Sequence, residues 1–78
     1  MATEIIRIGN YTVNYVSATR LMVQYEGEQI CKYDRTKEGI AELLADLIDF
    51  IVEDKLIKRK DETITKTNIK NAILAFAH

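Results

Sequence analysis

The feature that most constrains this 78-residue chain is the spacing of apolar side chains over residues 36–57. At about 100° per residue they fall on one broad helical face. That face consists of Ile40, Leu43, Leu44, Leu47, Ile48 and Ile51. Thr36 stands where an N-cap is needed, and the pattern breaks past Lys55, so a long amphipathic helix is expected over residues 36–57. Such a face has to be buried against another element, which the rest of the chain must supply.

Residues 1–34 are typical of strands. Two β-rich runs, residues 4–8 and 11–16, flank Gly9-Asn10, a pair suited to a two-residue hairpin turn. Pairing Ile8 with Tyr11 and Ile6 with Val13 brings the apolar side chains of both strands to one face. The faces agree: Ile6, Ile8, Tyr11, Val13 and Tyr15 on one side, and Arg7, Thr12 and Asn14 on the other.

A second hairpin is expected over residues 20–34, with Gly27 at the first position of a type II′ turn. In that register Tyr25 pairs with Ile30, but Val23 faces Lys32, so a bulge could shift the pairing. With residues 17–19 as the connection, residues 1–34 form an antiparallel meander of three or four strands.

A shorter helix is expected over residues 65–77. Thr65 is a candidate N-cap, and Ile64 and Ile69 occupy the positions of a hydrophobic staple. Ile69, Ala72, Ile73 and Phe76 follow at helical spacing, whereas residues 58–63 look like a polar connection. The predicted fold is therefore α+β, in the order ββββαα, within a single domain over residues 1–78.

Composition limits how such a small core can be reinforced. Cys31 is the only cysteine and His78 the only histidine, so neither an intrachain disulfide nor a four-ligand zinc site is expected. Self-association, as a homo-oligomer, remains open. The sequence shows no signal-peptide pattern and no apolar run of transmembrane length, and the lone cysteine suits a reducing compartment, so we expect a cytoplasmic protein without membrane contact.

The net charge of −1 conceals a segregated pattern. Residues 1–37 sum to +1, residues 38–54 to −6 and residues 55–70 to +4. The acidic segment contains no basic residue, and five of its six carboxylates recur every three or four positions. This acidic stripe consists of Glu38, Glu42, Asp46, Asp49 and Glu53.

Like charges four residues apart destabilise a helix by about 0.2–0.5 kcal/mol per pair, and the stripe contains three such pairs. It can be a solvated face, it can be paired with bases folding back from elsewhere in the chain, or it can bind a basic partner. A row of carboxylates can imitate phosphates in a nucleic-acid-binding groove or dock an arginine-rich protein surface.

The basic segment is an alternative site, for nucleic acid. It contains Lys55, Lys58, Arg59, Lys60, Lys66 and Lys70, which could contact phosphates together with Arg7 and Arg20 of the sheet. A solvated interhelix segment explains the same residues. The four tyrosines could stack bases, although Tyr11 and Tyr15 share the apolar face and are expected in the core.

Nothing in the chain indicates catalysis. The sequence has no nucleophilic triad and no phosphate-binding glycine loop, and a helix face of exposed carboxylates lacks the burial that tunes a general acid or base. A cation bound by Asp46, Asp49 and Glu53 would lack a loop to complete its oxygen cage. Cys31 is expected to be a half-buried strand residue, and no metal or other cofactor is expected.

The leading hypothesis is a non-enzymatic protein-binding module that presents the acidic stripe to a basic protein surface. An inhibitor or adaptor of the phage or mobile-element type is one form, for example an anti-CRISPR or anti-restriction protein that blocks a host defence nuclease. The alternatives are a nucleic-acid-binding protein that uses residues 55–70 and the sheet, or a self-assembling protein with Leu56, Ile57 and Leu74 at the subunit interface.

Overall fold

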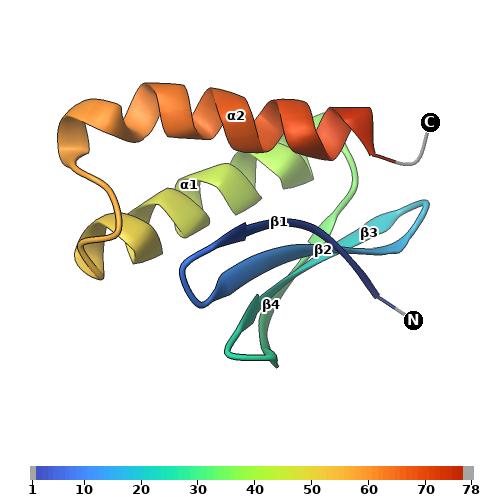
Figure 1. Cartoon of the computed structure of the whole chain (residues 1–78). Helices are drawn as coiled ribbons and strands as arrows, with labels where there is room; N and C mark the ends of the chain where they lie inside the picture. The colour runs from blue at the N-terminus through green and yellow to red at the C-terminus, as the bar shows by residue number, and fades with distance from the viewer. Residues whose placement is uncertain (1, 77–78) are drawn as a thin grey trace.

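The computed structural model describes residues 2–76 and shows a four-stranded sheet followed by two helices (Figure 1). The elements are β1 (Thr3–Ile8), β2 (Tyr11–Ser17), β3 (Arg20–Tyr25), β4 (Glu28–Asp34), α1 (Lys37–Glu53), the 3-10 turn η1 (Arg59–Asp61) and α2 (Glu62–Ala75). The strands pair in the order β1-β2-β3-β4, each antiparallel to its neighbour. This is the predicted α+β meander in the order ββββαα.

The two helices run antiparallel on the same side of the sheet (Figure 1). Helix α1 packs on β4 and α2 packs on β1, so the core lies between one helical layer and one sheet face. Its most deeply buried side chains are Val13, Leu21, Val23, Leu43, Leu47, Ile51, Ile69 and Ile73. Among residues 2–76, no helix covers the opposite face of the sheet.

The first hairpin has the predicted register, with Ile8 opposite Tyr11 and Ile6 opposite Val13. A bulge between Glu4 and Ile6, which alternation alone does not indicate, lets Ile5 pack against the core as well. Gly9 adopts φ 59, and a Cβ at this position would lie 2.8 Å from Leu56 Cδ1. The positive φ favours glycine at this turn, whereas the exposed side chain of Leu56 can rotate away from a Cβ.

The second hairpin corrects the predicted turn by one residue. Its two central residues are Glu26 and Gly27, at φ 51 and 86, and Tyr25 pairs with Glu28. Positive φ at both positions is the type I′ pattern, whose twist matches the flanking strands. A bulge at Ile30 then brings Val23 opposite Cys31, so the shift that the apolar pattern required is present.

Helix α1 begins as predicted and ends earlier than predicted. The Thr36 hydroxyl accepts the Gly39 N–H at 3.0 Å, which confirms the N-cap. The helix stops at Glu53, and Lys55 to Ile57 are not helical. Lys55 takes a left-handed conformation at φ 60, while the N–H groups of Lys55 and Leu56 donate to the carbonyls of Val52 and Ile51. This is a Schellman motif with lysine at the position where glycine is usual. Searching the sequence for a glycine therefore does not find this helix end.

Lys55→Gly is expected to stabilise the protein by about 1 kcal/mol, because glycine removes the steric cost of the left-handed conformation. The measurement is the free energy of unfolding from a urea titration. Lys58→Gly is the matched control, since Lys58 is exposed and has ordinary extended backbone at φ −89. The role assigned to Lys55 is contradicted if Lys55→Gly is no more stable than the wild type, or no more stable than Lys58→Gly.

Helix α2 begins three residues before the position predicted for it. Asp61 is its N-cap residue, without a side-chain hydrogen bond, and Thr65 lies inside the first turns. The predicted staple is wrong, because Ile64 is 62% exposed, although Ile69 and Ile73 are fully buried as expected. The 3-10 turn η1 leads directly into α2, and the Arg59–Glu62 ion pair at 3.0 Å joins the two segments. Ala77, at the predicted end of the helix, lies outside the described residues.

Candidate functional site

The acidic stripe lies on the solvent side of α1, as its spacing predicted. Glu38, Glu42, Asp49 and Glu53 are exposed, whereas the apolar face of the same helix is buried. At 1.5 Å of rise per residue the stripe is about 22 Å long. Thr36 fixes the start of this helix and the sheet supports its other face, so the carboxylates project from a rigid element rather than a loop.

Asp46 differs from the other four carboxylates of the stripe. It is half-buried, and its Oδ2 accepts the hydroxyl hydrogen of Tyr33 at 2.8 Å. Burial of Tyr33, followed by its hydrogen bonds to Cys31 and Asp46, raises the pKa of that phenol well above its usual range. Asp46 therefore connects α1 to β4, and one member of the stripe has a structural role that spacing alone did not reveal.

The stripe has no ion-pair partner in the part of the chain that the structure describes. The ion pairs found there are Arg7–Glu4, Arg20–Asp34 and Arg59–Glu62. None involves Glu38, Glu42, Asp46, Asp49 or Glu53. The hypothesis that bases fold back onto the stripe finds no support among residues 2–76. Only solvent or a partner therefore reduces the repulsion between carboxylates along α1.

A second tyrosine positions the C-terminal end of α1. Tyr11 donates its hydroxyl hydrogen to Asp54 Oδ2 at 2.6 Å and stacks parallel to Phe50 with ring centroids 5.9 Å apart. The hydrogen bond to Asp54, with burial second, raises the pKa of Tyr11 to about 12. The phenols of Tyr11 and Tyr33 thus hold α1 against the sheet near its end and near its middle. Tyr11 is in the core as predicted, and Tyr15 is half-buried.

The residues of the basic segment lie in different parts of the surface. Lys55, Lys58 and Lys60 line a shallow hollow at the connection between the helices, and Arg59 is paired with Glu62. Lys66 and Lys70 lie one turn apart on α2 and face α1 across a groove. Arg7 and Arg20, the sheet residues considered for phosphate contacts, are each paired with a carboxylate at 2.9 and 3.4 Å.

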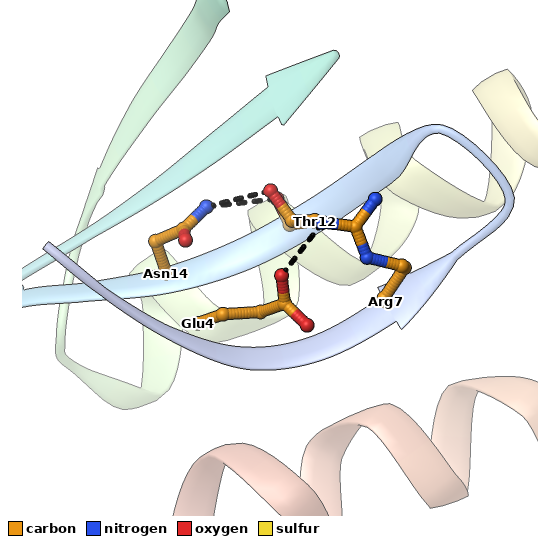
Figure 2. Close-up of polar contacts among 4 residues, drawn as sticks. All are labelled: Glu4, Arg7, Thr12 and Asn14. Carbon is orange, nitrogen blue, oxygen red and sulfur yellow. Dashed lines mark hydrogen bonds and ion pairs between the residues drawn. The ribbon is translucent and has the colours of Figure 1, made fainter. Parts of the chain in front are cut away.

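The open face of the sheet carries a self-contained polar cluster (Figure 2). Asn14 Nδ2 donates to Thr12 Oγ1 at 2.9 Å, and the Arg7–Glu4 ion pair lies beside them on β1. Thr12 and Asn14 are only 6% and 4% exposed although no helix of the described chain covers them, and sequence reasoning did not predict this burial. Met22, opposite Asn14, is also buried. Every buried side-chain N or O atom among residues 2–76 has a hydrogen-bond partner, so the buried polar groups of this cluster are satisfied within the fold.

Cys31 is half-buried in β4, as expected. Across residues 2–76, no three His, Cys, Asp or Glu side chains are arranged to hold a metal ion, and no helix there is long and apolar enough to cross a membrane. His78 lies outside the described residues.

Comparisons with known protein families, with curated proteins and with solved structures find no match to this chain.

Proposed function

We propose that this protein is a non-catalytic binding module that presents the acidic face of α1 to a basic protein surface. The observation that supports it best is four exposed carboxylates, Glu38, Glu42, Asp49 and Glu53, without ion-pair partners among residues 2–76. Mutual repulsion along the stripe destabilises the free protein by about 1 kcal/mol in total, and a basic partner would relieve it.

Charge and rigidity agree with this role. A row of carboxylates about 6 Å apart, fixed on a helix that two tyrosine hydroxyls hold to the sheet, is preorganised for cationic groups. One concrete form of the module is an inhibitor that occupies the nucleic-acid-binding groove of a host defence nuclease. There the carboxylates would take the places of backbone phosphates.

The experiment is an affinity pull-down from nuclease-treated lysate of the source cell, comparing the wild type with Glu42→Lys/Asp49→Lys. We expect the wild type to retain a protein that the variant does not. The free energy of unfolding of the variant should be about 2 kcal/mol higher, because each new lysine turns repulsive pairs into attractive ones. Loss of binding in a more stable protein cannot result from unfolding.

Glu28→Lys is the control, since Glu28 is an exposed carboxylate of β4 that lies outside the stripe. It should retain the partner. Retention of the same protein by the stripe variant would refute the proposal. Two further measurements distinguish the alternatives: salt-sensitive binding of an oligonucleotide would indicate a nucleic-acid-binding protein, and a solution mass above 9.0 kDa for the isolated protein would indicate self-assembly.

A further inference from the structure

A groove between α1 and α2 is separate from the acidic stripe. Two adjoining cavities of about 460 and 400 Å³ form it, and they share Ala41, Leu44 and Lys70. On α2 the lining extends from Thr63 to Leu74, which is about 16 Å along the helix. That length accommodates about three turns of another helix.

The charge lining the groove has one sign. Its apolar floor includes Ile40, Ala41, Leu44 and Leu74, while its rims carry Arg35, Lys37, Lys66 and Lys70. Among residues 2–76, no acidic residue lines either cavity. Lys37 and Ala41 each precede a stripe carboxylate by one residue. The stripe therefore lies about 100° around α1 from the groove.

One of the cations is held in place by the fold. Arg35 donates to the carbonyl of Phe76 at 3.2 Å and lies over the ring of Tyr15, 5.5 Å from its centroid. Lys37, Lys66 and Lys70 are exposed, and none of them is in an ion pair among residues 2–76. The groove thus offers a fixed guanidinium at one end and lysine ammonium groups along its rims.

We infer that this groove binds an acidic amphipathic helix of a partner protein. Apolar side chains at i, i+3 or i+4, and i+7 would enter the floor, and flanking carboxylates would meet the lysines. The groove is open along its length, since Ala41 is exposed and Leu74 is 46% exposed, so it cannot enclose a small acyl ligand. A second copy of this chain is a poor occupant, because α1 already buries its own apolar face.

The test is selection from a displayed library of 16-residue helical peptides against the whole protein. Enriched peptides should combine net negative charge with apolar residues at helical spacing. Two variants test the groove: Ala41→Gln fills the shared floor, and Lys70→Glu reverses a rim charge. Each should lower the affinity for the selected peptides about tenfold or more. Matched controls are Ala45→Gln, an exposed alanine on the next turn of α1, and Lys32→Glu on β4, which line neither cavity and should change nothing.

The inference is overturned if no peptide is enriched, if the enriched peptides are neutral or basic, or if they bind Ala41→Gln and Lys70→Glu as tightly as the wild type. Basic peptides that are lost with Glu42→Lys/Asp49→Lys would support the acidic stripe and refute the groove. Acidic peptides that still bind the Glu42→Lys/Asp49→Lys variant would support the groove, whether or not the acidic stripe binds a partner. The two proposals can therefore fail independently.

Discussion

Gly39→Ala is expected to destabilise the protein by about 3 kcal/mol, although alanine is the better helix former. Gly39 lies in the first turn of α1, where the chain turns back from β4, and a Cβ built on it would collide with the carbonyl oxygen of Asp34. That oxygen belongs to the backbone and cannot rotate away as a side chain could. Either α1 or the end of β4 must shift, and both contribute to the core.

Urea unfolding of Gly39→Ala beside Gly27→Ala measures this effect. Gly27 has φ 86 but nothing within 4 Å of an added Cβ, so its replacement should cost only about 1–2 kcal/mol of backbone strain. A larger loss at Gly39, where no unusual φ is involved, isolates the steric contact. If Gly39→Ala is as stable as the wild type or more stable, the Asp34 carbonyl does not lie against Gly39 as described.

The second large effect is a loss of stability in alkali. The pKa of Tyr11 is about 12 in the folded protein and near 10 in the unfolded chain. Above pH 10 the unfolded state therefore binds fewer protons than the folded state. Stability therefore falls as pH rises from 10 toward 12, by about 2 kcal/mol at pH 12 from this residue. Below pH 10 the contribution is fully present. Tyr33, whose pKa is also raised, acts in the same direction.

Tyr11→Phe is the appropriate comparison for this alkaline transition. It keeps the ring that stacks on Phe50 and removes the hydroxyl that donates to Asp54. We expect a variant that is less stable than the wild type at pH 8 but loses less between pH 10 and 12. Free energies of unfolding from urea titrations at each pH provide the measurement. Parallel pH profiles for the two proteins would show that Tyr11 does not carry the effect.

Local pattern was sufficient for much of the fold. Alternation determined the register of Ile6 with Val13, because a slip of one residue would turn every side chain to the wrong face. The 3.6-residue period placed Leu43, Leu47 and Ile51 in the core and the acidic stripe opposite them. These features depend on side chains close together in the chain, so the sequence by itself determined the order ββββαα and the exposure of four of the five stripe carboxylates.

Other features depend on contacts between residues far apart in the chain, and only the tertiary structure decided them. Asp46 became half-buried because α1 lies across Tyr33. The groove beside Lys70 exists only because α2 packs against α1. A periodic pattern shows which face of an element is buried. It does not specify which polar atom on a neighbouring element will meet that face, because packing, rather than spacing, sets those distances.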